Sequence, residues 1–276
     1  MKFRKDISMH LKVYGNLIAV GTPGQMIHFT SNASSPQMKD WGNIWFYSSG
    51  NANIDYINVT YGNIGVYLFY ASNSTVTNSS FSYNERGVKI NGGPNNTVIN
   101  NIFIGNKAGV QFEDSQNNTV TNNNITLSTI TGIYSVNSVK NKIYHNNIID
   151  NADQAYDDRD GNIWNDTYPS GGNYWSNWSP ITPDSHNGSI TPQMTGSPDG
   201  ICDDPYPIDG DSIDYYPLKY PFGSAPPIDN ELPTIDNVEA DPNPQEVYNY
   251  VNISARVADN KQLGVVRINI TDPLGG

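Results

Sequence analysis

The chain has 276 residues, of which 37% are hydrophobic and 15% charged, and its formal net charge is −12. Abundant Asn, Ser, Thr, Gly and Tyr favour a turn-rich, all-β protein, because Asn and Gly are poor helix formers. The negative charge excludes nucleic acid as a partner, since its phosphates require Lys and Arg. No apolar run reaches the roughly 18 residues of a membrane span, and the single cysteine excludes an intrachain disulfide.

The N-terminal part predicts a first coil of short strands over 11–13, 17–19 and 27–29, with His28 facing solvent. Nothing before Leu11 resembles a capping helix, and the apolar run 17–20 is too short for a signal peptide. Sequons of the form N-x-[ST] are frequent, as in extracellular proteins. We therefore expect a piece of a longer protein that lies outside the cell or on its surface.

A repeat of 22 residues, with one interval of 23, runs from residue 43 to residue 148. Apolar residues recur one, three, eleven and sixteen positions after each anchor, with Ser135 as the one polar exception. The anchors are Asn43, Gly65, Gly87, Gly109 and Gly132. Alternation over short runs predicts strands, and a unit this short buries a core only by stacking, with coils about 4.8 Å apart. The sequence therefore predicts a parallel β-helix over residues 1–165.

Thirteen positions after three successive anchors stand Asn78, Asn100 and Asn122. We expect an inward ladder in which each amide bonds to its neighbours above and below, because Asn tolerates the left-handed backbone of such a turn. The alternative is a row of polar ligands in an open groove.

Residues 166–222 predict a capping segment, because terminal repeats need a cover. The residues large enough to provide it are Trp164, Tyr174, Trp175 and Trp178. The pair Gly171 and Gly172 would let the backbone cross the end of the coils closely. The alternative for Trp175 and Trp178 is a platform for a sugar ring.

Three blocks in this part resemble, in order, the closing signature of NosD-like right-handed β-helix proteins of prokaryotic cell surfaces. The blocks are GGNYWS at 171–176, DGICDDPYPI at 199–208 and DYYPL at 214–218. The chain departs from that pattern at Asn177, where the family often has an acid, and at Cys202, where it usually has Gly. The resemblance covers roughly residues 10–220 and implies a right-handed β-helix outside the cytoplasm.

The founding members of that family are periplasmic accessory factors of copper delivery. Copper sites use clustered His, Cys or Met side chains. This chain has four scattered histidines, five methionines and one cysteine, so we do not expect copper delivery.

Five carboxylates in the same segment lie on loops that contain glycine, which suits a hard cation such as calcium. They are Asp199, Asp203, Asp209, Asp211 and Asp214. The other interpretation is a solvated acidic loop built of Asx turns. Calcium is thus a candidate ligand, and no cofactor is required.

A Pro-rich linker follows over residues 223–233, and residues 234–276 predict three further strands at 234–238, 251–257 and 265–270. These strands resemble the opening of an immunoglobulin-like surface domain. Such a sandwich takes about 100 residues, so this piece is truncated.

The repeats show no column of Asp, Glu, Lys or Arg that stacking would turn into a catalytic groove. Arg86 and Lys89 look isolated, and Glu113 and Asp114 are neighbours whose side chains point to different faces. A glycosidase needs two carboxylates about 5 to 9 Å apart. The sequence therefore predicts a non-catalytic protein, and a polysaccharide lyase or hydrolase is the alternative.

Tyrosines on outward positions could stack on sugar rings, and the candidates are Tyr67, Tyr83 and Tyr134. We expect an architectural spacer or adhesion module with glycan contacts. Its partners would be the neighbouring domains of a larger surface protein and an extracellular polysaccharide.

Overall fold

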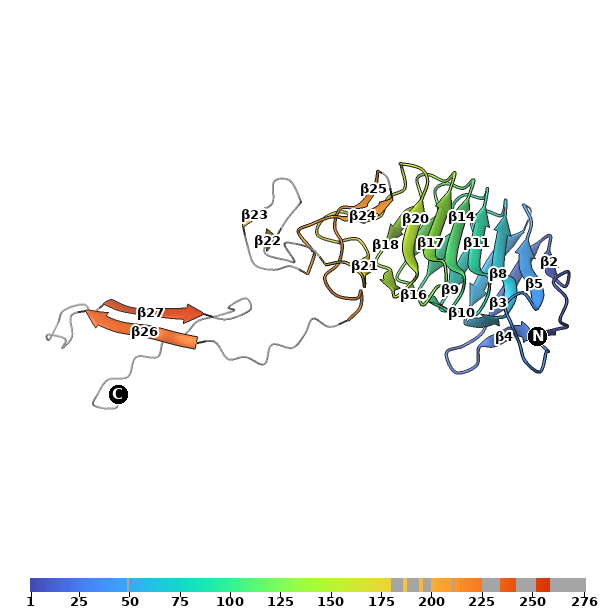
Figure 1. Cartoon of the computed structure of the whole chain (residues 1–276), viewed down its shortest axis with the longest axis horizontal. Coiled ribbons are helices and arrows are strands. Elements are labelled where there is room, and N and C mark those ends of the chain that lie inside the picture. Colours follow the sequence, from blue (N-terminus) through green and yellow to red (C-terminus); the bar gives the residue numbers. More distant parts are fainter. Residues whose placement is uncertain are drawn as a thin grey trace.

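The computed structural model describes residues 1–48, 50–179, 200–209 and 211–224, together with the backbone of 186–187, 194–195, 234–241 and 252–258. Figure 1 shows a stack of coils, each of which contributes one strand to each of three parallel sheets. The described part contains strands and turns and no helix, hence none with the length and hydropathy of a membrane span. The predicted all-β parallel β-helix is confirmed.

The eight-stranded sheet consists of β1 (Lys2–Phe3), β4 (Ile27–Ser31), β7 (Ile57–Thr60), β10 (Ser80–Ser82), β13 (Ile102–Ile104), β16 (Asn124–Thr126), β19 (Asn147–Ile149) and β21 (Tyr174–Trp175). The seven-stranded sheet consists of β2 (Leu11–Val13), β5 (Trp41–Phe46), β8 (Gly62–Phe69), β11 (Arg86–Asn91), β14 (Ala108–Glu113), β17 (Thr131–Val136) and β20 (Asp153–Asp157). The six-stranded sheet consists of β3 (Asn16–Val20), β6 (Asn51–Asp55), β9 (Thr75–Thr77), β12 (Thr97–Ile99), β15 (Thr119–Thr121) and β18 (Lys142–Tyr144).

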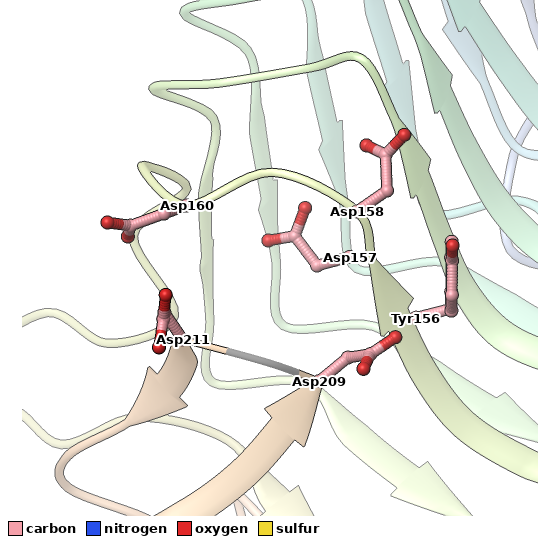
Figure 2. Close-up of a pocket in the computed structure, with 6 residues that line it drawn as sticks. All are labelled: Tyr156, Asp157, Asp158, Asp160, Asp209 and Asp211. Carbon is pink, nitrogen blue, oxygen red and sulfur yellow. The ribbon is translucent and has the colours of Figure 1, made fainter.

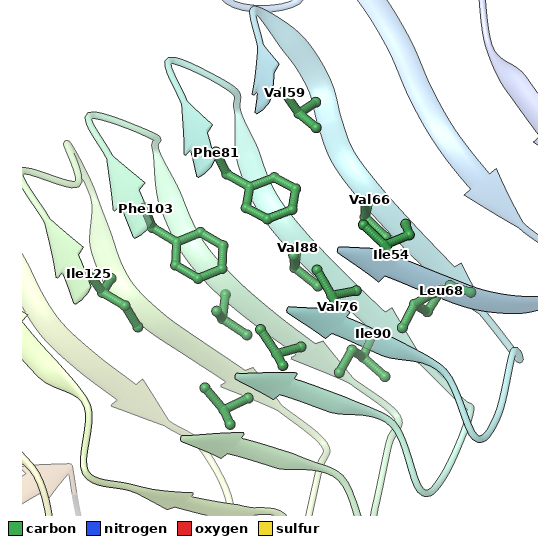
Figure 3. Packing of buried hydrophobic residues seen from close by; sticks show 14 of the residues in the cluster. Ile54, Val59, Val66, Leu68, Val76, Phe81, Val88, Ile90, Phe103 and Ile125 are labelled. Carbon is green, nitrogen blue, oxygen red and sulfur yellow. The ribbon is translucent and has the colours of Figure 1, made fainter. Parts of the chain in front are cut away.

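The register follows the repeat, because each residue pairs with its equivalent in the next coil. Val88, for example, pairs with Val66 on one side and with Val110 on the other. Figure 3 shows the resulting columns, such as Phe81 above Phe103, whose rings stack at 5.1 Å. All four predicted columns are buried, including Ser135, which accepts a hydrogen bond from the Asn162 amide.

The glycine at the anchor position has a steric cause. A Cβ atom on Gly87 would lie 2.5 Å from Cδ1 of Phe103 and 2.6 Å from the carbonyl oxygen of Gly109. Real Cβ atoms do not approach this closely, so only glycine lets the aromatic column pack against the strand here.

Hydrogen-bonded side chains run through the core at three corners of the coils. The first ladder contains Ser79, Asn101, Asn123, Asn146 and Asn173. The second contains Ser74, Asn96, Asn118, Asn141 and Asn162. The third contains two linked pairs, Asn84 with Asn106 and Ser128 with Asn151, and the Ser128 hydroxyl between them has no hydrogen-bond partner among the described residues.

The bonds repeat from one coil to the next. The backbone N–H of Asn101 donates to Oδ1 of Asn123 at 2.9 Å, and the Asn101 amide donates to the same oxygen at 3.1 Å and to the Val76 carbonyl at 2.8 Å. Buried backbone groups that lose their sheet partners at a corner are satisfied in this way.

The prediction that Asn78, Asn100 and Asn122 form the inward ladder is wrong by one position. Their left-handed backbone is confirmed, with φ of 46°, 58° and 57°. Their side chains are half-exposed or exposed, because the left-handed residue makes the turn and the residue after it points into the core.

Each ladder ends on an acceptor. The N–H of Asn173 donates to Oδ2 of Asp214 at 2.7 Å, and the Asn162 amide donates to both carboxylate oxygens of Asp157 at 2.9 and 3.1 Å. The third ladder ends on the side-chain oxygen of Gln154. The last coil and the capping segment thus supply the final acceptor of each of the three ladders.

Outside the coils, β24 (Tyr206–Asp209) and β25 (Ser212–Asp214) form an antiparallel pair, and β24 contacts β20. Two more antiparallel pairs join β22 (His186–Asn187) to β23 (Met194–Thr195) and β26 (Thr234–Asp241) to β27 (Asn252–Ala258). The last pair matches the first two strands predicted for the immunoglobulin-like domain. The third predicted strand and most of the linker lie outside the described residues, so that domain stays a prediction.

Asn101 and Asn100 provide a test of the ladder within one turn. We expect Asn101→Ala to lower the free energy of unfolding by more than about 3 kcal/mol, because it leaves several buried groups unpaired. Asn100→Gly keeps the left-handed backbone and should change stability by less than about 0.5 kcal/mol. Urea unfolding of both variants measures the difference. Equal losses of stability would contradict the assignment of Asn101, and not Asn100, to the ladder.

Candidate functional site

The outer face of the seven-stranded sheet carries the densest set of functional side chains in the described part of the chain. One column on it, read through the strand register, contains Lys12, Trp45, Tyr67, Lys89, Gln111, Tyr134 and Tyr156. A second column on the same face contains Phe69, Asn91, Glu113 and Val136.

Polar residues from β11, β14 and the preceding turns form one hydrogen-bonded group, here called the charged network. Its members are Lys39, Glu85, Arg86, Lys89, Asn91, Lys107, Gln111 and Glu113.

The network has two carboxylate centres. Glu85 contacts three cations, namely Lys39, Lys107 at 3.5 Å and Arg86 at 3.6 Å. Glu113 forms an ion pair with Lys89 at 2.6 Å and accepts hydrogen bonds from the amides of Asn91 and Gln111 at 3.0 and 3.1 Å. Arg86 also donates to the oxygen of Gln111, which links the two centres.

Aromatic rings continue the network toward the first coils. The Lys89 ammonium lies 5.4 Å from the centre of the Tyr67 ring, and the opposite neighbour of that ring is Trp45, stacked at 5.4 Å. Burial, and secondarily the charge of Glu113, raises the pKa of Tyr67 to about 12. Tyr67 is therefore held between two partners and stays protonated at neutral pH.

The other predicted sugar contacts lie in different places. Tyr134 stacks on Tyr156 at 5.1 Å in the same column as Tyr67. Tyr83 lies in the turn between β10 and β11, near-parallel to Tyr61 at 5.9 Å, and is 49% exposed. A Cβ atom on Gly105 would lie 3.0 Å from the Tyr83 ring, so glycine in the next coil makes room for it.

The two tryptophans assigned to either a lid or a sugar platform lie against the end of the coils. Trp175 is buried, stacks on Tyr206 at 4.1 Å and donates its indole N–H to Asp214 at 2.9 Å. Trp178 is half-buried and meets the Tyr206 ring edge-on. A Cβ atom on Gly172 would lie 1.9 Å from Oδ1 of Asp214, which explains the glycine there. This geometry is that of a lid.

An acidic recess of about 290 Å³ opens beside the capping segment (Figure 2). Its lining consists of Tyr156, Asp157, Asp158, Asp160, Asp209 and Asp211. Asp157 already accepts hydrogen bonds from the Trp164 indole at 3.1 Å and the Ser212 hydroxyl at 2.9 Å, besides the ladder amide. The carboxylate at this corner therefore closes the second ladder.

The residues predicted to bind calcium do not form one group. Asp209 and Asp211 line the recess, whereas Asp214 is fully buried at the end of the first ladder. Asp203 is buried and does not line the recess, and Asp199 lies outside the described residues. Across the described ranges, no three His, Cys, Asp or Glu side chains are grouped so that they could hold a metal. Calcium binding stays a prediction.

A family model described as "Periplasmic copper-binding protein (NosD)" matches residues 19–180, which is more than half of the chain. The chain belongs to the NosD family. Comparison with the curated proteins gives no match, and comparison with the solved structures gives none either.

The charged network of this NosD-family chain is the feature that sequence reasoning missed. Arg86 and Lys89 look isolated along the chain, and their partners Gln111 and Glu113 stand at other offsets of the next repeat. The sequence did contain a signal for these contacts, because residues 22 positions apart are neighbours in a stack of coils. Lys89 lies beside Gln111, and Asn91 lies beside Glu113.

Removal of the lid tests its structural role. We expect Trp175→Ala to lower the free energy of unfolding by about 3 to 5 kcal/mol, because a buried indole and its hydrogen bond are lost. Trp178→Ala should cost less, since that side chain is only half-buried. Thermal unfolding measures both, and an unchanged melting temperature with lost sugar binding would favour the platform instead.

Asp214 gives the fold a pH dependence. Burial raises its pKa to about 7, although N–H donors from Asn173, Trp175 and Tyr216 oppose the shift. Between about pH 4 and pH 7 the folded chain then holds a proton that the unfolded chain releases. The free energy of unfolding should therefore fall by a few kcal/mol at most as pH rises through this range, and it should level off at higher pH.

The matched variant is Asp214→Asn, which resembles the protonated carboxyl at every pH. We expect it to equal the parent chain near pH 4 and to lack this component of the pH dependence. Urea unfolding across pH 4 to 9 gives the difference curve, and a flat difference would refute the raised pKa.

Proposed function

We propose that this chain is a non-catalytic β-helix module of a larger periplasmic or cell-surface protein, where it serves as a rigid spacer that can adhere to glycans. The observation that carries the proposal is the closure of every corner ladder by the last coil or the cap. A stack whose ladders end on acceptors of its own chain can keep its coils in place along the axis without needing a ligand.

The family match supports the proposed periplasmic or cell-surface location. NosD proteins are described as periplasmic, and the Asn-rich coils and sequons of this chain suit the same side of the membrane. The strands β26 and β27 beyond the cap support a multidomain protein, in which neighbouring domains are the direct partners.

The charged network supports a non-catalytic role. Glu113 and Lys89 form an ion pair at 2.6 Å, and the amides of Asn91 and Gln111 donate hydrogen bonds to the same carboxylate. A general base or acid must be directed at substrate, whereas these groups are engaged with one another. The protonated Tyr67 phenol beside them does not supply a base at neutral pH either.

Copper binding, which the family description names, does not fit the donor atoms of this chain. His10 accepts a hydrogen bond from the backbone of Asn43, and His145 stacks on Phe222 at 4.0 Å. His28 lies exposed on β4, and the described residues bring no three His, Cys, Asp or Glu side chains together as ligands. The donor atoms of the described residues therefore support the proposal that this chain does not deliver copper.

Two measurements test this proposal. Single-molecule pulling on the chain should unfold the coils as one unit, because the ladders couple each coil to the next, and stepwise peeling of coils at low force would count against a spacer. Assays for reducing sugars and unsaturated products on neutral and uronic polysaccharides should show no turnover. Turnover that Glu113→Gln abolishes would favour the alternative of a polysaccharide-processing enzyme.

A further inference from the structure

One corner of the solenoid carries an excess of positive charge on a chain whose net charge is −12. In the charged network, four cations face only two carboxylates, Glu85 and Glu113. The Glu85 side chain is 13% exposed, while Lys39 and Lys107 are 43% and 41% exposed. The carboxylate is thus covered and the ammonium groups remain accessible.

The cations follow the solenoid axis. Glu85 and Lys107 occupy equivalent positions in the turns before β11 and β14, and Lys39 lies in the turn region before β5. Successive coils are about 4.8 Å apart. Lys39 and Lys107 therefore approach Glu85 from opposite sides along the axis, so that their half-exposed side chains lie along this edge on either side of the carboxylate.

The same turns present an aromatic ring. Tyr83 lies two residues before Glu85, and Gly105 lies two residues before Lys107. The Tyr83 ring lies between Gly105 of the next coil and the Tyr61 ring at 5.9 Å, and the residue is half exposed. An apolar ring face beside ammonium groups is the combination that holds a sugar ring carrying a negative charge.

The charge balance indicates how acidic the ligand is. A densely charged polymer would be repelled by the remaining surface of this acidic chain. An excess of two positive charges suits a polymer with no more than one charge per sugar and many hydroxyl groups. A uronic acid polysaccharide has this chemistry, and a heavily sulfated polymer does not.

We propose that the corner formed by Lys39, Tyr83, Arg86 and Lys107 binds a uronate-containing polysaccharide that lies along the solenoid axis. The lysines and Arg86 pair with its carboxylates, and Tyr83 packs on a sugar ring. This assignment rests on the proposed role as an adhesive surface module and names its ligand class.

The test is titration calorimetry of the whole chain with polygalacturonate at low salt. Lys39→Gln combined with Lys107→Gln should weaken binding at least tenfold, and added salt should weaken the parent chain in the same way. The matched control, Lys2→Gln combined with Lys142→Gln, removes the same charge from exposed positions on β1 and β18 and should bind as the parent does. Tyr83→Ala should also weaken binding, at an unchanged salt dependence.

Neutral dextran and dextran sulfate complete the experiment. Dextran should not bind, and dextran sulfate should bind more weakly than polygalacturonate. Equal affinity of the two double-lysine variants for polygalacturonate would overturn the assignment. Tighter binding of dextran sulfate than of polygalacturonate would overturn it as well. Failure of every polymer to bind would also overturn it while leaving the spacer role intact, and turnover of polygalacturonate would instead contradict the non-catalytic role.

Discussion

The buried asparagine that bonds to the backbone of the neighbouring coil is the interaction on which this structure depends. At each corner the chain leaves one sheet and enters another, so its N–H and C=O groups need new partners inside the core. Asparagine supplies both a donor and an acceptor. Because Asn101 is completed by Asn123, and Asn123 by Asn146, no coil is satisfied on its own. The cap is thus part of the fold, since Asp214 completes the last asparagine of this ladder.

The period of 22 residues predicted the sheets, their register and the apolar columns correctly, because one coil equals one repeat and equivalent residues must stack. The ladder was misplaced for a local reason. Two adjacent asparagines, such as Asn100 and Asn101, both suit a turn, and composition does not distinguish the one that bends the chain from the one that points inward. The distinguishing signal lies in other coils, where Ser79 and Asn146 occupy the inner position while His145 occupies the outer one.

The outer face was harder to predict, because it depends on contacts between different offsets of different coils. Lys89 reaches Glu113, and Arg86 reaches both Glu85 and Gln111, so no single column contains the charged network. Aromatic positions were easier to find, yet their roles depend on neighbours. Tyrosines with covered ring faces support the coils, whereas exposure decides which of them can meet a ligand. The recess likewise contains Asp209 and Asp211, which the sequence singled out, but it also contains Asp157, whose hydrogen bonds to Trp164 and Ser212 belong to the fold.

The ladders also have a direction. In the first ladder every backbone N–H donates toward the C-terminal end, to the side-chain oxygen of the next coil, while the Asn amides also donate back to carbonyl oxygens of the preceding coils. The last backbone N–H of such a ladder therefore points at the capped end and needs an acceptor there. Asp214 and Asp157 supply that acceptor for the first and second ladders, which accounts for the two buried carboxylates at this end of the coils. The position of these two acids is thus a consequence of the direction in which the backbone groups of the ladders donate.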